Sequence, residues 1–158
     1  MDKIRIGIVG YGNLGRGVQY ASAQNADTEV VAVFTRRAPE TVKTVLPVKV
    51  EKYEDMKNYV GKIDVMILCG GSATDLPAQS AEVAKLFNTV DSFDTHAKIP
   101  EYFAALDKSA KDAGHLSAMS IGRDPGLFSL ARIYFGSSLA DGSTYTFWGK
   151  GVSQGHSD

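Results

Sequence analysis

Short apolar runs alternate with amphipathic stretches over most of the chain. The runs at 4–9, 29–34 and 63–69 are apolar nearly throughout, which is typical of strands buried on both faces. Helical spacing of apolar residues follows the first run, up to about residue 25. Further strands are predicted at 48–52, 88–92 and 115–120, and further helices at 53–60, 76–87, 100–113 and 127–135. This alternation predicts an α/β fold, a doubly wound Rossmann-type parallel sheet with helices on both faces.

Three glycines follow the first predicted strand directly. Gly10, Gly12 and Gly15 have the spacing G-x-G-x-x-G and stand between a strand and a helix. Such glycines make a tight turn, let phosphates approach the backbone and let the helix pack close to the strand. The exposed N–H groups of the helix start suit a pyrophosphate. A tight turn without a ligand is the alternative, but three glycines exceed what a plain turn needs, so we predict a dinucleotide site.

The end of the second predicted strand carries Thr35, Arg36 and Arg37. In proteins that use NAD an acidic residue near this point takes the ribose 2′-hydroxyl, whereas a basic residue accommodates a 2′-phosphate. The nearby acid, Glu29, falls at the other end of the strand. A guanidinium can hold a phosphate bidentately. A solvated loop is the alternative for an arginine pair, but its place one βα unit after the glycines favours NADP.

Three more loops are expected on the ligand side of the sheet, after its later strands. Residues 70–75 are small, so this loop can lie against a cofactor, and Asp75 is expected to cap the following helix. Asp94 follows the fifth predicted strand, and residues 121–126 follow the sixth. Cys69 has no evident partner that would make it a nucleophile, and we interpret it as a small buried residue.

Composition and charge narrow the class of protein. The chain has 158 residues, 44% of them hydrophobic, and a net charge of −1, so nothing indicates a nucleic-acid or membrane surface. With one cysteine no intrachain disulfide can form, and the first predicted strand begins at Ile4, close to the first residue. We therefore expect a cytoplasmic protein with no metal site.

The last part of the sequence has a different character. One more strand is predicted at 143–148, and the glycine-rich residues 149–158 follow it. A strand without a neighbour leaves its backbone groups unpaired. We therefore expect an NADP-binding domain over 1–120, and the incomplete start of a second domain over 121–158.

Taken together, these motifs resemble those of one family, the meso-diaminopimelate dehydrogenases. The resemblance rests on the glycine turn and on residues 35–37, 69–75, 90–96, 124–129 and 146–158. It covers the whole chain but only about the first half of the family's length. It implies an NADP-dependent oxidoreductase that reversibly deaminates the D-centre of meso-2,6-diaminopimelate, giving L-2-amino-6-oxopimelate and ammonia in lysine and cell-wall precursor metabolism. It also implies that residues 121–158 begin a domain for substrate binding and dimerisation, and that the enzyme is a homodimer whose dimerisation region would lie beyond this chain.

The resemblance also implies roles for particular residues. Substrate-binding positions would be Asp94, Asp124, Trp148 and Gln154. Cofactor-binding positions would be Gly10, Tyr11, Gly12, Asn13, Leu14, Gly15, Thr35, Arg36, Arg37, Cys69, Gly70, Gly71, Ser72, Ser92, Phe93, Asp94, Gly122, Arg123, Asp124, Pro125, Gly126 and Leu127. Without the family, Asp124 would be interpreted as a turn residue and Trp148 as a packing residue.

One residue departs from the family pattern, because Arg123 stands where the family has tryptophan. A guanidinium there could attract a substrate carboxylate or disturb the pocket. Three hypotheses stay open at this point. The chain is the first part of the enzyme, with some of its apolar surface exposed; or it is an NADP-binding module that is inactive by itself; or it is a subunit completed by another chain.

Overall fold

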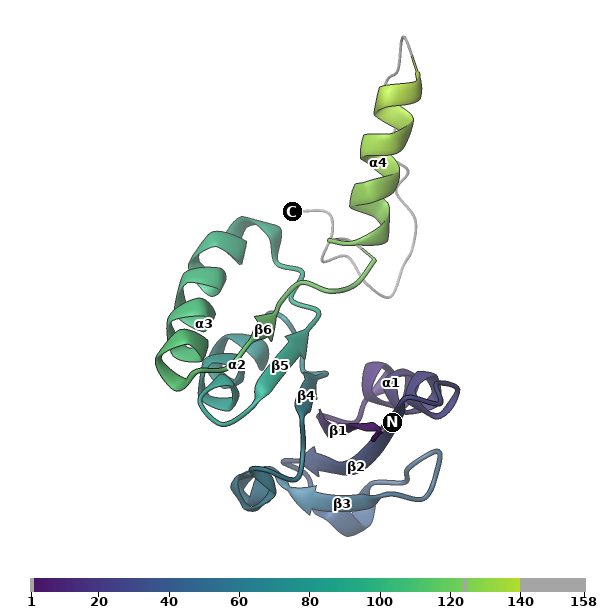
Figure 1. The fold of residues 1–158 in the computed structure, drawn as a ribbon, viewed down its shortest axis with the longest axis vertical. Helices are drawn as coiled ribbons and strands as arrows, with labels where there is room; N and C mark the ends of the chain where they lie inside the picture. Colours follow the sequence, from purple (N-terminus) through teal and green to yellow (C-terminus); the bar gives the residue numbers. More distant parts are fainter. Residues whose placement is uncertain (1, 124, 140–158) are drawn as a thin grey trace.

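The computed structural model describes residues 2–123 and 125–139. Their core is one sheet of six strands in the order β3-β2-β1-β4-β5-β6, with every neighbouring pair parallel (Figure 1). The strands are β1 (Ile4–Val9), β2 (Thr28–Thr35), β3 (Lys49–Lys52), β4 (Val65–Leu68), β5 (Asn88–Asp91) and β6 (Ser117–Ala118). The order reverses between β1 and β4, which is the Rossmann arrangement predicted from the sequence.

Four helices accompany the sheet: α1 (Asn13–Ala23), α2 (Leu76–Ala84), α3 (Ile99–Ala113) and α4 (Leu127–Ser138). Short 3-10 segments lie over Pro39–Thr41, Tyr53–Tyr59 and His96–Lys98. The helix expected over 53–60 is thus a 3-10 segment. The strand expected over 115–120 is only two residues long, since Ser120 leaves the strand conformation with a φ of 58°. The predicted strand over 143–148 lies outside the described residues.

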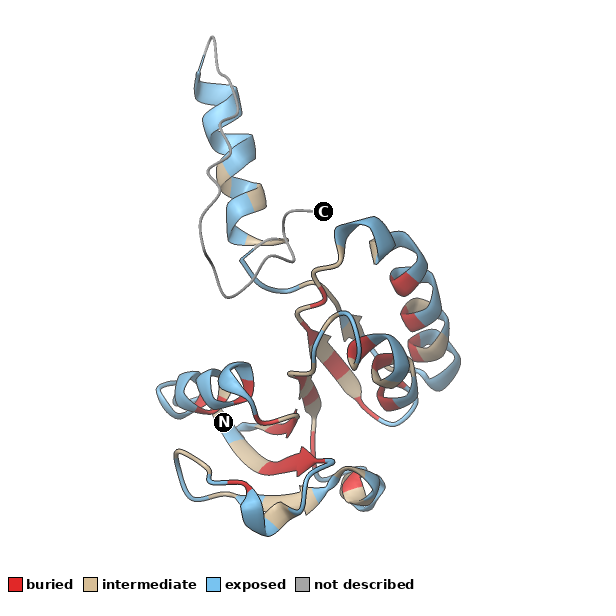
Figure 2. Cartoon of the chain, turned by 180° about the vertical axis from the view of Figure 1, so that it is seen from behind, coloured by how far each residue is buried: buried red, intermediate tan, exposed pale blue. Residues whose placement is uncertain are grey.

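Alternate residues of β1 enter two different cores. Ile6 and Ile8 belong to a cluster with Val33 on one face, and α1 packs against this half of the sheet. Val9 belongs to a larger cluster on the other face, where Phe34 is fully buried and where α2 and α3 pack. The buried residues follow the strands and the inner sides of the helices (Figure 2). Burial of each such side chain contributes about 1.5–3 kcal/mol to the free energy of folding. Because both faces of the sheet carry a core, both faces contribute to its stability.

Helix α4 lies apart from this sheet (Figure 1). Most of its apolar side chains are exposed, namely those of Leu127, Phe128, Leu130, Ile133, Tyr134 and Phe135. None of the described residues of α4 is buried. The expectation of exposed apolar surface in this part of the chain is therefore confirmed.

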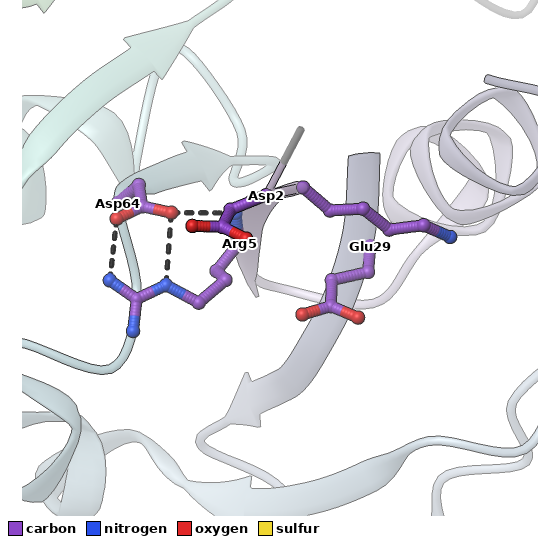
Figure 3. A pocket seen from close by; sticks show the side chains of 5 residues that line it. Asp2, Arg5, Glu29 and Asp64 are labelled. Atoms are coloured by element: carbon purple, nitrogen blue, oxygen red, sulfur yellow. Dashed lines mark hydrogen bonds and ion pairs between the residues drawn. The ribbon is translucent and has the colours of Figure 1, made fainter. Parts of the chain in front are cut away.

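An ion pair joins β1 to β4 at the amino ends of the strands. Arg5 donates from Nη2 and Nε to the two carboxylate oxygens of Asp64, at 2.6 and 3.0 Å, and its backbone N–H donates to the same carboxylate at 2.8 Å. Figure 3 shows the two side chains facing each other, with Glu29 on the neighbouring strand. A polar hollow of about 600 Å³ lies here, at the opposite end of the strands from the glycine turn.

Candidate dinucleotide site

A cleft of about 260 Å³ lies at the carboxyl ends of β1, β2 and β4. The strand order reverses at this point, and such a crevice is where open α/β sheets bind their ligands. The residues that line it are Gly10, Tyr11, Gly12, Thr35, Arg36, Arg37, Cys69, Gly70, Gly71 and Asp75. All of these except Asp75 are among the residues that the sequence predicts for cofactor binding. The structure thus brings three separate predicted segments together in one cleft.

The glycine turn has the geometry that its spacing predicts. Gly10 has a φ of 86°, a conformation that strongly favours glycine. A Cβ on Gly15 would lie 2.4 Å from the carbonyl oxygen of Gly10, so only glycine lets α1 approach β1 so closely. A Cβ on Gly12 would meet no atom within 4 Å. The space beside Gly12 is therefore open toward the cleft, and α1 begins there without a side-chain cap on its first N–H groups.

Tyr11 lines the cleft, but its side chain is buried in the protein. The ring is buried, and its hydroxyl donates to Oε1 of Gln19 and accepts from the backbone N–H of Val45 at 2.9 Å. The backbone carbonyl of Tyr11 accepts from Nη2 of Arg37 at 2.8 Å. Sequence reasoning missed Gln19, whose polar side chain on the buried face of α1 was the available signal. The two side chains fix the loop between strand and helix.

The two arginines of the cleft have different partners. Arg36 Nη2 lies 2.5 Å from Oδ1 of Asp75, whereas Arg37 is held by the neutral carbonyl of Tyr11. Thr35 is buried, and its Oγ1 accepts from the backbone N–H of Arg37 at 3.1 Å, which turns the chain at the end of β2. The arginine pair thus faces the glycine turn, as a phosphate site at this point would require.

Asp75 does not cap α2, contrary to the prediction. Its backbone is helical, with φ −96° and ψ −52°, so the carboxylate does not take the usual capping position. Its Oδ2 instead accepts from the backbone N–H of Gly71 at 3.0 Å, and its Oδ1 pairs with Arg36. The N–H of Gly71, and next the guanidinium of Arg36, hold the pKa of Asp75 below its ordinary value. Sequence reasoning therefore missed an acidic group in the cleft.

The small-residue loop after β4 connects the cleft to the loop after β5. Cys69 packs with the apolar face of the sheet, and burial raises the pKa of its thiol to about 12. Cys69 is only half-buried, less than the sequence predicts, but a raised pKa agrees with the expectation that it is no nucleophile. Ser72 accepts, at its Oγ, the backbone N–H of Asp94 at 3.1 Å. Asp94 thus lies beside the predicted cofactor loop.

The residues predicted for cofactor binding in the loops after β5 and β6 differ in what they expose. The ring of Phe93 is buried and stacks on Tyr102, with ring centroids 3.9 Å apart, so only its backbone can face a ligand. The loops after β5 and β6 lie close together, because a Cβ on Gly122 would lie 3.9 Å from Cβ of Ser92. The guanidinium of Arg123 lies 5.0 Å from the centre of the Phe128 ring.

Several predicted residues cannot be placed. Asp124, Trp148 and Gln154 lie outside the described residues. Over 2–123 and 125–139 no three histidine, cysteine or acidic side chains are grouped as a metal site would require. In the same ranges no helix has both the length and the apolar character needed to cross a membrane.

Comparison with known proteins identifies the class. Residues 4–88 match the model of the oxidoreductase family with an NAD-binding Rossmann fold, and the chain belongs to that family. Residues 122–158 match the diaminopimelic acid dehydrogenase C-terminal domain. The resemblance to the meso-diaminopimelate dehydrogenases, predicted from the sequence, is thereby confirmed, and similarity to individual proteins extends it over the whole chain.

The meso-diaminopimelate D-dehydrogenase of Ureibacillus thermosphaericus is 62% identical over 158 residues, which are 100% of this chain and 48% of that protein. The crystal structure of Corynebacterium glutamicum DAP dehydrogenase in complex with DAP has a TM-score of 0.83 and 43% identity, covering 99% of this chain and 48% of that one. An engineered D-amino acid dehydrogenase bound to NADP⁺ has a TM-score of 0.84 and 42% identity, covering 98% and 47%. The chain spans about half the length of the curated relatives it matches.

Proposed function

We propose that this chain forms the NADP-binding part of a meso-diaminopimelate dehydrogenase. The reaction would be the reversible oxidative deamination of the D-centre of meso-2,6-diaminopimelate to L-2-amino-6-oxopimelate and ammonia. The observation that carries the proposal is the cleft in which the glycine turn faces Arg36 and Arg37. A relative 42% identical over almost the whole chain is bound to NADP⁺ in its crystal structure, which supports the same cofactor here.

The residues of the cleft fit the two ends of such a cofactor. The open space beside Gly12 and the uncapped start of α1 suit the pyrophosphate. Arg36 and Arg37 suit a 2′-phosphate, which a guanidinium can hold bidentately. Asp75 in the same cleft would repel a phosphate, but it is partly neutralised by its ion pair with Arg36. The balance of two arginines against one carboxylate favours NADP over NAD.

The substrate would meet the loops after β5 and β6. Its D-centre carries an ammonium group, which the carboxylates of Asp94 and Asp124 would pair with. Trp148 and Gln154 would complete this part of the site. When bound, NADP supplies the hydride acceptor, while the residues of the protein orient the reacting carbon and exclude water. The imine that remains takes up water and releases ammonia.

The exposed apolar face of α4 favours an alternative for the chain on its own, which is that it binds NADP but is inactive by itself. Side chains such as Leu130 and Ile133 are about 70% exposed, and further sequence of a longer protein would cover them. The relatives are about twice as long, so the substrate site and the homodimer contacts would be completed by that further sequence. We place the whole enzyme in the cytoplasm.

The test combines binding with turnover. The 158-residue chain is titrated with NADPH, and nicotinamide fluorescence gives the dissociation constant. Formation of NADPH from NADP and meso-diaminopimelate is then measured with this chain and with a protein of the relatives' full length that contains it. We expect NADPH binding by both and turnover only by the longer protein. Failure of both to bind NADPH contradicts the proposed cofactor, and turnover by the shorter chain contradicts the incomplete site.

A further inference from the structure

Asp91 is a buried carboxylate at the end of β5 to which the proposed reaction assigns no role. It is 2% exposed and accepts three hydrogen bonds. Its Oδ1 accepts the backbone N–H of Phe93 at 3.0 Å and that of Ser120 at 3.2 Å. Its Oδ2 accepts from the hydroxyl of Tyr102 at 2.5 Å. Because a buried carboxylate is costly unless it is hydrogen-bonded, this set of donors makes the position of Asp91 well defined.

The donors belong to three elements, of which the loop after β6 lies 29 residues further along the chain than Asp91. Phe93 lies in the loop that carries Asp94, Ser120 lies in the loop after β6, and Tyr102 lies on α3. The backbone carbonyl of Asp91 also accepts the N–H of Ile121 at 2.8 Å. Asp91 therefore fixes the loop after β5 and the loop after β6 relative to each other and to the helix beneath them.

Ser120 adds an independent sign of constraint. Among the described residues it is the one non-glycine with a positive φ, 58°, a conformation that costs about 1–2 kcal/mol for such a residue. Its Oγ is buried and has no hydrogen-bond partner among the described residues. The hydrogen bond to Asp91 holds this conformation, and with it the direction in which the chain leaves β6 toward Gly122.

The surroundings of Asp91 are rigid. The Tyr102 ring lies flat on Phe93, with an angle of 3° between the rings, and its hydroxyl is also hydrogen-bonded to Ser80. Burial, and next the carboxylate of Asp91, raise the pKa of the Tyr102 hydroxyl, which therefore keeps its proton. The hydroxyl of this stacked Tyr102 and the two backbone N–H donors together hold the carboxylate of Asp91 in one position.

We propose that Asp91 is the positioning residue for the nicotinamide end of the site, holding the Asp94 loop against the loop after β6. The inference rests on the proposed function, because it requires a dinucleotide that runs from the glycine turn past β4 to these loops. The adenosine end of the cleft, at β1 and β2, has no contact with Asp91. Loss of Asp91 therefore affects one end of the cofactor and spares the other.

The test uses two ligands with the 158-residue chain, NADPH and 2′,5′-ADP, which lacks the nicotinamide half. Asp91→Ala is expected to weaken NADPH about tenfold and to leave 2′,5′-ADP within about twofold, since two backbone donors lose their acceptor. Asp91→Asn keeps an oxygen for both donors and can donate to Tyr102, so it is expected to restore most of the NADPH affinity. Thr89→Val is the control, because Thr89 is equally buried on β5 and its hydroxyl is hydrogen-bonded to that of Ser117 on β6, at 2.8 Å.

Equal losses of both ligands in Asp91→Ala, or unchanged NADPH binding, would overturn the inference, and so would a matching effect of Thr89→Val. If Asp91→Ala does not fold, Tyr102→Phe replaces it, since this change keeps the stacked ring and removes one donor. We then expect NADPH about threefold weaker with 2′,5′-ADP unchanged, and no difference in NADPH would refute the role. If the unaltered chain binds neither ligand, the same variants are compared in the longer protein; if that protein also binds neither ligand, the proposed function itself fails and this inference falls with it.

Discussion

Arg36 and Asp75 join two walls of the cleft, because their ion pair runs from the end of β2 to the loop between β4 and α2, and β1 lies between β2 and β4. One guanidinium of the proposed phosphate site is thus already paired with a carboxylate. Arg37 contacts only the neutral carbonyl of Tyr11 through its Nη2. The two neighbouring arginines therefore offer different net charge to an incoming phosphate, although the sequence presents them as equivalent.

Arg37→Ala is expected to weaken NADPH more than Arg36→Ala does. No acidic side chain among residues 2–123 and 125–139 forms an ion pair with Arg37. Charge-assisted hydrogen bonds to a phosphate are each worth about 1.5–3 kcal/mol, which corresponds to about tenfold or more in affinity. NADH, which lacks the 2′-phosphate, should lose less than about twofold in either variant. Dissociation constants for NADPH and NADH in both variants and in the double variant provide the measurement.

Lys108→Ala is the matched control, since it removes a surface cation on α3, where Lys108 pairs with Asp112. Equal losses of NADPH and NADH in the double arginine variant would contradict the 2′-phosphate assignment. A larger loss of NADPH affinity for Arg36→Ala than for Arg37→Ala would contradict only the argument that Asp75 offsets the charge of Arg36. The 2′-phosphate assignment would stand.

The parts of the site that follow from local sequence could be predicted. Gly10, Gly12 and Gly15 have roles that their spacing determines, because turn geometry and helix packing act over a few residues. The Rossmann arrangement, once inferred from the alternating strands and helices, places the loop over 70–75 beside the glycine turn. The residues that line the cleft were therefore largely predictable.

What could not be predicted depends on side chains that meet across the sheet. Asp75 has the sequence context of a helix cap, yet its helical backbone and the N–H of Gly71 direct its carboxylate to Arg36. The pattern over 115–120 indicates a full strand, but β6 covers only Ser117–Ala118, and the positive φ of Ser120, with its bond to Asp91, excludes that residue from the strand. Such contacts depend on tertiary geometry, which hydrophobic periodicity does not contain.

Gly12→Ala is expected to abolish most cofactor binding without loss of stability. A methyl group there would meet no protein atom within 4 Å, and the φ of −95° suits alanine, so the fold tolerates it. The methyl would occupy the space proposed for the phosphates. NADPH affinity should fall at least about tenfold, while the urea midpoint stays within error or rises slightly.

The control is Gly17→Ala on the same helix, also with no atom within 4 Å of the added methyl. This change should raise stability by about 0.5–1 kcal/mol and leave NADPH binding unaltered. NADPH binding by Gly12→Ala at the affinity of the unaltered chain would mean that the phosphates do not approach this turn.

Gly15→Ala is expected to lower stability and cofactor affinity together. Its Cβ would lie 2.4 Å from the carbonyl oxygen of Gly10, a backbone atom that cannot move without shifting the turn. Overpacking of this kind costs about 1–3 kcal/mol, and displacement of α1 also moves the N–H groups proposed for the pyrophosphate. Urea denaturation and NADPH titration of the same preparation measure both effects. A stable variant with normal binding would show that α1 can move away from β1 without consequence.

The Arg5–Asp64 pair predicts a specific dependence of stability on pH. Hydrogen bonds from Arg5 lower the pKa of Asp64 to about 2 from an ordinary value of 3.8. Because the folded-state pKa is the lower one, the pair stabilises the folded protein above pH 3.8, and this stabilisation is lost as the pH falls from there toward 2. The carboxylate is 43% exposed, so the effect is small and weakens further in salt.

Urea midpoints of the unaltered chain and of Asp64→Asn test this dependence. They should differ by a constant amount between about pH 5 and 7 and converge below about pH 4. In an Arg5→Met background the pH-dependent part of this difference should largely disappear, leaving the contribution of the backbone N–H of residue 5. A difference that grows as the pH falls would have the wrong sign for a carboxylate stabilised in its charged form.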